Sequence, residues 1–324
     1  MYPADVRQDR PVEVFMAHMD VVFSDETELP LRVEDGRIYC PGVGDDTACL
    51  VCLLLAGKYI ARHVDSPSWR EIRGEDAPGL LLVCNAGEEG LGNLKGVHKI
   101  CEDYGDRMER FCTFDSSLSS IVDRAVGSKR FRVRVRTRGG HSYNNFGNDN
   151  AIACLASLVG ELYGIRVPEG GKTTYNVGMI SGGTSVNTIA QEAEMLYEFR
   201  SDRRENLEYM ERQFMKVIDR GKSEGMDVSL EIIGVRPCEG PVDPKRKQAL
   251  SDWAHRVVEE MTGQAPKHCA GSTDCNIPLS LGIPSVCVGS FRGAGAHTRE
   301  EYVETDSLEE GYKVAFGMIF GSRD

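Results

Sequence analysis

Short apolar runs alternate with longer helical patterns along the first part of the chain. The runs in VEVFMAHMD, APGLLLVCNA and RFCTFDSS have the length of strands, and the segments DDTACLVCLLLAGKYIARHV and LKGVHKICEDYG between them have the length of helices. This strand–helix–strand order predicts a parallel sheet. After PCEGPVDP the α/β pattern resumes, with a helix over QALSDWAHRVVEEMTG, a strand at PSVCVG and a last helix from about Ser307.

The middle of the chain has a different pattern. KRFRVRVRTR alternates strictly, which predicts a strand with one solvent-facing side. It is followed by a helix in DNAIACLASLVGELYG, strands in TTYNVGMI and AEMLYEFRS, a helix in RRENLEYMERQFMKVIDRGKSEG, and a strand in MDVSLEIIG. This β-α-β-β-α-β order is typical of a ferredoxin-like unit. We therefore predict an α/β domain over residues 1–119 and 235–324, interrupted by an α+β domain over 120–234.

The alternating strand places five arginines on one face: Arg130, Arg132, Arg134, Arg136 and Arg138. Such a face is a solvated surface or a subunit contact, or else a nucleic-acid patch. The chain has a net charge of −12, and the strand has little aromatic interleaving, so the first interpretation is favoured. The acidic charge also argues against a general partner among nucleic acids or anionic membranes.

The composition is that of an ordinary globular protein, with 324 residues, 41% hydrophobic and 27% charged. The first residues, MYPADVRQDR, are polar and do not look like a signal peptide, and no apolar run approaches the roughly 18 residues of a membrane span. Several of the 11 cysteines sit inside apolar runs. This pattern indicates reduced thiols in a cytoplasmic protein. Cys49 and Cys52 form a C-x-x-C pair, but they lie in a stretch that reads as a buried helix, which disfavours a redox or zinc role.

Polar residues follow the strands of the predicted parallel sheet. His18 ends the first apolar run, Glu88 and Glu89 follow the second, and Asp115 follows the third. Ligands of such sheets bind beyond the C-terminal ends of the strands. Two adjacent glutamates repel each other, so the pair is either a solvated turn or a site where a cation holds one carboxylate and leaves the other to move a proton.

Five residues near strand ends or in the following loops carry metal-binding chemistry: His18, Asp45, Glu89, Asp115 and His297. Two imidazoles and three carboxylates suit zinc, manganese or cobalt better than calcium. If one carboxylate bridges, the five ligands make two sites of three ligands each. Taken singly, each has a plainer interpretation, such as a structural histidine, a helix N-cap at Asp45 or a turn at Asp115.

The motifs HMDVVF, PGVGDDT, GEEGLG, FDSS, GGHS, GGTSVNTIAQEAE and GAHTREEYVETDSL occur in the order expected of one family. On these motifs the chain resembles the dinuclear metallohydrolases that include peptidase T, aminoacylase, glutamate carboxypeptidase and succinyl-diaminopimelate desuccinylase. The resemblance covers nearly the whole chain, and GEEGLG and GSTD look closest to the peptidase T-like branch. It implies a zinc-peptidase-like catalytic domain with a mostly parallel sheet, and an inserted lid and dimerisation domain.

The resemblance also implies roles for the candidate residues. Asp45 would bridge two divalent ions, His18 and Asp115 would complete one site, and Glu89 and His297 the other. Asp46 is a second candidate for the bridging ligand. Glu88 would be the general base toward a water held between the metals. Asp20, expected on the same strand face as His18, would accept the other imidazole N–H and orient the ring.

The inserted domain is expected to contribute further residues. His141 matches a lid histidine that reaches the active site of the partner subunit and stabilises the tetrahedral oxyanion. Asn187 and Arg200 match positions that help to bind a substrate carboxylate. The resemblance thus implies a homodimer that forms through the lid domain.

These features predict a cytoplasmic hydrolase of an amide or peptide bond in a di- or tripeptide or an N-acyl amino acid. One alternative is a deacylase of a specific metabolite, and another is a catalytically silent binding protein with the same fold. Only 17 residues precede His18, whereas the family usually has a longer segment there. We expect this difference to alter the packing at one edge of the sheet.

Overall fold

The computed structural model describes residues 10–23, 28–63, 66 and 77–321. The short N-terminal segment, for which altered packing is expected, falls largely outside these ranges. The chain forms two compact units, one of Met1–Ala125 with Glu239–Asp324 and one of Val126–Cys238. The second unit is therefore an insertion in the first.

The first unit is built on a six-stranded sheet in the order β13-β6-β14-β5-β1-β4. All neighbouring strands run parallel except β14 and β6, which run antiparallel. The predicted mostly parallel sheet is confirmed. Its strands are β1 (Val12–His18), β4 (Gly79–Asn85), β5 (Met108–Phe114), β6 (Ser120–Ala125), β13 (Lys267–Gly271) and β14 (Ser285–Val288).

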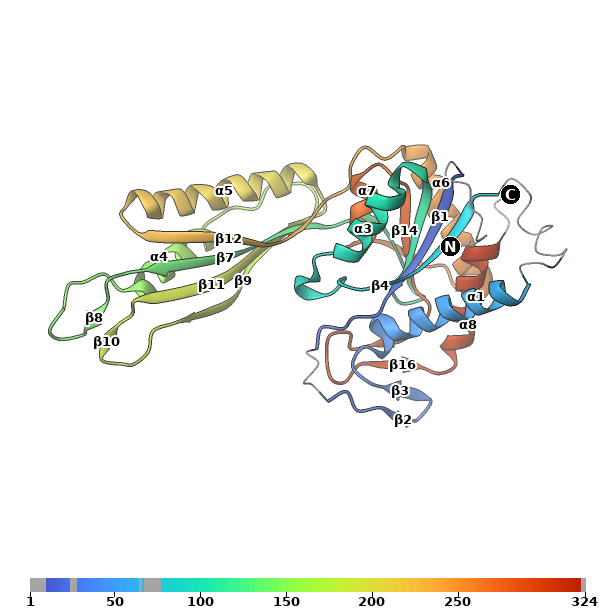
Figure 1. Ribbon diagram of the computed structural model, residues 1–324, viewed down its shortest axis with the longest axis horizontal. Helices are drawn as coiled ribbons and strands as arrows, with labels where there is room; N and C mark the ends of the chain where they lie inside the picture. Colours follow the sequence, from blue (N-terminus) through green and yellow to red (C-terminus); the bar gives the residue numbers. More distant parts are fainter. Residues whose placement is uncertain (1–9, 24–27, 64–65, 67–76, 322–324) are drawn as a thin grey trace. The chain divides into compact units, whose positions relative to one another are not determined.

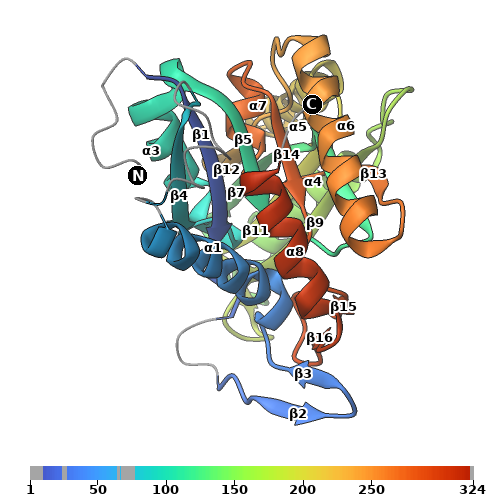
Figure 2. The same cartoon turned by 90° about the vertical axis from the view of Figure 1, so that its right-hand side faces the viewer.

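Helices cover both faces of this sheet (Figure 2). One face packs against α1 (Cys49–His63), α6 (Pro244–Thr262) and α8 (Ser307–Phe320), and the other packs against α3 (Lys95–Tyr104) and α7 (Asn276–Ser280). Strand β1 is therefore covered on both faces, and all seven of its residues are buried. Phe15 packs in the apolar core on the side of α1, α6 and α8, and Val14 and Met16 pack in the core on the side of α3 and α7. No helix in the described ranges is long and apolar enough to cross a membrane.

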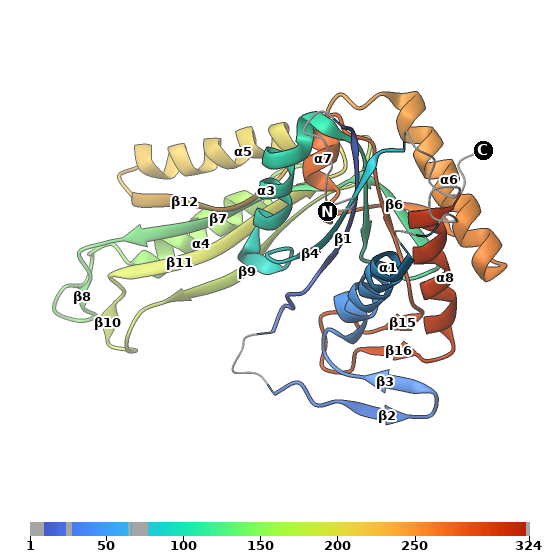
Figure 3. The ribbon, with the colours of Figure 1, turned by 45° about the vertical axis from the view of Figure 1, so that its right-hand side comes forward.

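A smaller antiparallel sheet in the same unit has the order β15-β16-β3-β2 (Figure 3). It joins segments from the two ends of the sequence: β2 (Arg32–Glu34), β3 (Arg37–Tyr39), β15 (Gly293–Ala294) and β16 (Tyr302–Glu304). The irregular turn η1 (Val43–Ala48) connects β3 to α1, and the short 3-10 segments η2 (Gly90–Gly92) and η3 (Gly105–Arg107) flank α3. The helix expected to start at the Asp45–Asp46 pair begins only at Cys49, because Asp45 and Asp46 have non-helical backbone angles.

The inserted unit has a four-stranded antiparallel sheet in the order β12-β7-β11-β9 (Figure 1). Helices α4 (Ala151–Tyr163) and α5 (Arg204–Ser223) contact each other and the central strands, and enclose one apolar core with them. The strands are β7 (Gly127–Arg136), β9 (Thr173–Gly182), β11 (Glu192–Ser201) and β12 (Asp227–Arg236), and the short pair β8 (Gly140–His141) and β10 (Thr188–Ile189) lies beyond them. The chain order is β-α-β-β-α-β in this unit, as the sequence pattern predicts.

The arginines of β7 make ion pairs with glutamates on the two neighbouring strands. Arg132 contacts Glu231 on β12 at 2.8 Å, and Arg136 contacts Glu192 on β11 at 3.1 Å. Opposite charges on facing strands favour the pairing of those strands. These carboxylates lie close to the arginines and offset part of the positive charge of the strand.

The boundaries of the insertion differ from those expected from the sequence. Residues 120–125 form β6, which pairs with β13 and β14 in the six-stranded sheet, so they belong to the first unit rather than to the insertion. At the other end, β12 continues to Arg236 and the insertion ends at Cys238. The sequence suggested an earlier boundary because β6 and β7 follow one another with only Val126 between them.

A buried ion pair at the base of the sheet provides a test of the packing. The Glu13 side chain is fully buried on β1, and its carboxylate lies 3.1 Å from Nε of Arg110 on β5. Burial lowers the pKa of the Arg110 guanidinium to about 10. Glu13→Ala should lower the free energy of unfolding by about 3–5 kcal/mol, because it leaves a buried charge without its partner.

Urea unfolding followed by circular dichroism measures this change. Glu309→Ala is the control, since it removes an exposed carboxylate that pairs with Lys313 on α8. The control should leave the unfolding curve nearly unchanged. Equal effects of the two substitutions would contradict the assignment of Glu13 and Arg110 as a stabilising buried pair.

Candidate metal centre

Three neighbouring strands end at one place on the sheet edge and bring polar residues there. His18 is the last residue of β1, Glu88 and Glu89 follow β4, and Asp115 follows β5. Because β5, β1 and β4 are adjacent and parallel, their C-terminal ends meet at the same edge. The structure thus brings together side chains that lie up to 97 residues apart in the sequence.

Asp45 contacts two imidazoles with its two different oxygens. Its Oδ1 lies 3.0 Å from Nε2 of His18, and its Oδ2 lies 3.0 Å from Nε2 of His297. Asp45 comes from the turn η1, and His297 from the loop between β15 and β16. A carboxylate placed between two imidazoles in this way has the arrangement of a bridging ligand.

A further carboxylate lies near each of the two imidazoles that Asp45 contacts. Glu89 Oε1 lies 3.1 Å from Nε2 of His297, and Asp115 Oδ1 lies 3.8 Å from Nε2 of His18. Donor atoms of Asp45, Glu89 and His297 all lie within 4.8 Å of one another. Two atoms that bind one zinc ion at about 2.0–2.2 Å lie roughly 3 Å apart, so the donor set and its spacing fit a divalent metal.

Asp46 has a different environment from Asp45. It is fully buried, and its Oδ2 accepts a hydrogen bond of 2.8 Å from the backbone N–H of His18. It also forms a compact group with His18 and Asp115, so it remains the competing ligand candidate. Asp45, unlike Asp46, contacts both imidazoles, which favours Asp45 as the bridge.

The cluster carries a large excess of negative charge. Burial raises the pKa of Glu89, with a further contribution from Asp45, and burial together with Asp115 raises the pKa of Asp46. Burial lowers the pKa of His18, but the nearby carboxylates of Asp115 and Asp45 outweigh it and hold the pKa well above its usual range. Two divalent cations would remove most of the repulsion among these carboxylates.

Asp20 lies where it can accept the other N–H of the His18 ring, and the accepting atom is its backbone carbonyl oxygen. Nδ1 of His18 lies 2.9 Å from the backbone carbonyl oxygen of Asp20, and 3.8 Å from its carboxylate. A carbonyl oxygen only accepts, so Nδ1 donates to it, and Nε2 is the ring nitrogen that would bind a metal ion.

The Asp20 carboxylate instead holds the loop that carries the two glutamates. It accepts hydrogen bonds from the backbone N–H groups of Gly87, Glu88 and Glu89, at 2.9, 3.3 and 2.9 Å. Gly87 has a φ of 87°, a backbone conformation that glycine adopts without steric cost. The Asp20 carboxylate therefore positions Glu88 and Glu89, while the Asp20 carbonyl oxygen contacts the imidazole ring.

Glu301 is a site residue that the sequence interpretation missed. Its side chain is buried and accepts three backbone hydrogen bonds from the turn that carries Asp45. Its partners are backbone atoms more than 250 residues away, which leave no signal in the sequence. The only available signal is its place in the motif GAHTREE, four residues after His297.

A cavity of about 290 Å³ lies beside the cluster, within the first unit. Asp45, Asp115 and Glu301 line it, together with Phe291 and the glycine-rich stretch 293–296. Its volume is at the small end of the range of about 300–1,000 Å³ that is typical of ligand pockets. It gives a small molecule access to the carboxylates of Asp45 and Asp115.

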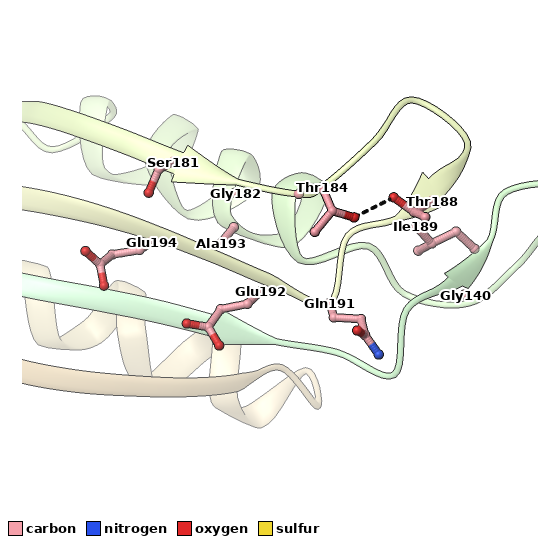
Figure 4. A pocket seen from close by; sticks show the side chains of 11 residues that line it. Gly140, Ser181, Gly182, Thr184, Thr188, Ile189, Gln191, Glu192, Ala193 and Glu194 are labelled. Carbon is pink, nitrogen blue, oxygen red and sulfur yellow. Dashed lines mark hydrogen bonds between the residues drawn. The ribbon is translucent and has the colours of Figure 1, made fainter.

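His141 and Asn187 lie together in the inserted unit. His141 pairs with Thr188 between β8 and β10, and Ser142 donates a backbone hydrogen bond to the carbonyl of Asn187. They flank a cavity of about 710 Å³ at the ends of β9 and β11, in which the Thr184 and Thr188 hydroxyls lie 3.1 Å apart (Figure 4).

Arg200 lies near the other end of β11. Strand β11 rises about 3.4 Å per residue, so Arg200 is roughly 27 Å along it from Glu192, which lines the cavity next to β8. Glu198 receives two hydrogen bonds from the Arg200 guanidinium, at 2.9 and 3.1 Å. Within one inserted unit, Arg200 and His141 therefore cannot contact the same small molecule.

Asp45→Asn and Asp46→Asn are a matched pair that tests which aspartate is the bridge. Asp45→Asn should weaken the binding of divalent metal by more than about 10-fold, because it alters a group that contacts both imidazoles. Asp46→Asn keeps an oxygen that can accept the His18 N–H bond, so its metal affinity should stay within about threefold of the unsubstituted protein. Titration of the metal-free protein against a chromophoric chelator measures both affinities, and the reverse order would assign the bridge to Asp46.

Comparisons with known proteins agree with this geometry. A family model described as Peptidase family M20/M25/M40 matches residues 14–320. The succinyl-diaminopimelate desuccinylase of Bordetella parapertussis is 24% identical over 322 residues, which cover 92% of this chain and 79% of that protein.

Solved structures show the same fold. The aminopeptidase PepT from Bacillus cereus has a TM-score of 0.69 and 20% identity, and the match covers 98% of this chain and 82% of that one. The di-peptidase Dug1p from Saccharomyces cerevisiae has a TM-score of 0.71 and 15% identity, with 96% and 80% covered.

The match to the family model includes every residue of the cluster, from His18 to His297. The fold, the donor set and this match lead to one conclusion. The chain belongs to peptidase family M20/M25/M40 and is a metal-dependent hydrolase of C–N bonds in peptide or acyl-amino acid substrates.

Proposed function

We propose that the protein hydrolyses the amide bond of a small peptide or N-acyl amino acid at a centre of two divalent metal ions. Zinc is the first candidate, with manganese and cobalt as alternatives. The observation that carries the proposal is the placement of Asp45, whose two oxygens each lie 3.0 Å from a different imidazole. His18 and Asp115 would hold one ion, and Glu89 and His297 the other.

Glu88 is the proposed general base. When bound, the ions supply the Lewis acidity that activates a water molecule and polarises the scissile carbonyl. Glu88 is 5% exposed, and a carboxylate oxygen of Glu88 lies within 4.8 Å of donor atoms of His18 and Glu89. From this position it takes a proton from the attacking water and delivers it to the leaving amine.

The substrate is proposed to be small. The cavity beside the cluster has a volume of only about 290 Å³, which supports a substrate of a few residues rather than an unfolded protein chain. A metabolite-specific deacylase is the second candidate, because the relative from Bordetella parapertussis is a desuccinylase. Activity on dipeptides and tripeptides, compared with N-succinyl and N-acetyl amino acids, separates these two candidates.

The cell compartment and the excluded partners are also part of the proposal. All 11 cysteines are free thiols, which supports a reducing compartment such as the cytoplasm. The net charge of −12 supports the absence of nucleic-acid and anionic-membrane partners.

A homodimer through the inserted unit is the proposed assembly. Strand β9 is at the edge of its sheet and exposes Met179 and Ile180, with 64% and 57% of their surface accessible. An exposed edge strand with apolar side chains is a ready template for pairing with a second chain. Asn187 and His141 from one chain and Arg200 from the other would then be able to contact one substrate.

The tautomer of His141 suits the proposed role in oxyanion stabilisation. The backbone N–H groups of Tyr143 and Asn144 point to Nδ1 of His141, at 3.2 and 3.4 Å. Since an N–H only donates, Nδ1 is the acceptor and the neutral ring carries its proton on Nε2. The exposed side chain can therefore donate a hydrogen bond from Nε2 to a developing oxyanion.

Glu88→Gln tests the assignment of the base. It should lower kcat by about 10²–10⁴-fold while the protein retains its metal, because the amide cannot accept a proton from water. Glu89→Gln, the neighbouring substitution of the same kind, should instead weaken metal binding. Metal content by plasma mass spectrometry and turnover are measured on the same samples, and an active Glu88→Gln protein would reject the assigned base.

Mixed dimers test the role of His141. His141→Ala should lower kcat by about 10²–10³-fold with a smaller change in KM, because the group acts on the transition state. If His141 acts across the dimer, random exchange of His141→Ala chains with Glu88→Gln chains gives dimers with one complete site, and about a quarter of wild-type turnover returns. Native mass spectrometry confirms the exchange between dimers, because it separates mixed dimers from the two parent dimers, and no recovery of activity would contradict the cross-subunit role.

A further inference from the structure

The Glu301 carboxylate holds the backbone on which the bridging residue lies. Its Oε2 accepts the N–H of Gly42 at 2.6 Å, and its Oε1 accepts the N–H groups of Gly44 and Asp45, each at 2.8 Å. The side chain is 2% exposed. Hydrogen bonds from N–H groups to an ionised carboxylate are about twice as strong as those between neutral groups.

Glu301 also belongs to the loop that presents the second imidazole. It lies four residues after His297, between β15 and β16. One side chain therefore connects the turn that carries Asp45 with the loop that carries His297. The two residues that it connects meet at 3.0 Å, through Asp45 Oδ2 and His297 Nε2.

The loop that carries His297 has a backbone conformation that needs support from outside. His297 has a φ of 66°, which is uncommon for a residue with a side chain. A residue in such a conformation persists where its surroundings over-determine it. Around Gly44 the fit is close, because an added Cβ would lie 2.7 Å from the Phe291 ring and 3.0 Å from Glu301 Oε1.

We propose that Glu301 is a positioning residue of the metal centre. By fixing the amides of residues 42–45, it aims the two oxygens of Asp45 at the two imidazoles. Its loss therefore weakens the binding of metal on both sides of Asp45. The inference rests on the proposed metal centre and adds to it a residue that acts on Asp45 through the backbone of residues 42–45.

Glu301→Gln is the substitution that tests this role. The Gln carbonyl can still accept from Gly44 and Asp45, but its NH₂ group then faces the N–H of Gly42, and two donors meet where one bond of 2.6 Å was. Loss of a residue that orients a metal ligand typically costs about 10–100-fold in metal affinity. Glu300→Gln is the control, since it makes the same change of charge at the preceding residue, whose side chain is exposed.

The measurement is competition of the full-length, metal-free proteins with a chromophoric chelator for zinc. We expect the zinc dissociation constant of Glu301→Gln to rise by about 10–100-fold, and that of Glu300→Gln to stay within about twofold. Excess zinc should restore most of kcat, because the substitution weakens metal binding and leaves the proposed base Glu88 in place. A purely structural role would lower the melting temperature of the metal-free protein and leave the dissociation constant at the wild-type value, which would overturn the proposal.

A second variant covers the case in which Glu301→Gln does not fold. Glu301→Asp keeps the charge but shortens the side chain by one methylene, so at least one of the three bonds is lost. A rise of about threefold or more in its zinc dissociation constant supports the proposal, and an unchanged value rejects it. If the wild-type protein itself binds no zinc, manganese or cobalt, the proposed metal centre fails, whereas normal wild-type binding with unaffected variants rejects only the role of Glu301.

Discussion

The repulsion among buried carboxylates at one edge of the sheet is the constraint on which the site depends. Asp45, Asp46, Glu88, Glu89 and Asp115 lie around only two imidazoles. A cluster of this kind is costly without cations, and backbone groups must hold it in place. Asp20 and Glu301 do so, because each uses one carboxylate to collect three backbone N–H groups from a ligand loop.

These two carboxylates link parts of the chain that the sheet alone does not connect. Asp20, just after β1, fixes the loop after β4, and Glu301, before β16, fixes the turn before α1. The strands bring His18, Glu89 and Asp115 to one edge of the sheet, while the loops determine the distances between their side chains and that of Asp45. The fold therefore determines where the centre lies, and the carboxylates of Asp20 and Glu301 hold the loops that determine its geometry.

The parts of this arrangement that were predictable from sequence are those with a local signal. Strand ends in a parallel sheet converge, so polar residues after apolar runs predicted the meeting of His18, Glu89 and Asp115. The contact of Asp20 with the His18 ring was expected, but its carboxylate's bonds to the N–H groups of residues 87–89 were not, because backbone partners carry no residue-type signal. Glu301 was missed because its partners are backbone amides, which carry no residue-type signal.

The central claim is that the cluster binds two metals and that these support amide hydrolysis. The most direct test is to purify the protein without chelator, measure metal per chain by plasma mass spectrometry, and assay the same sample on di- and tripeptides and N-acyl amino acids. The account predicts about two divalent ions per chain and hydrolysis that a chelator abolishes. Little bound metal and no turnover after addition of zinc, manganese or cobalt would contradict it and favour a silent binding protein with this fold.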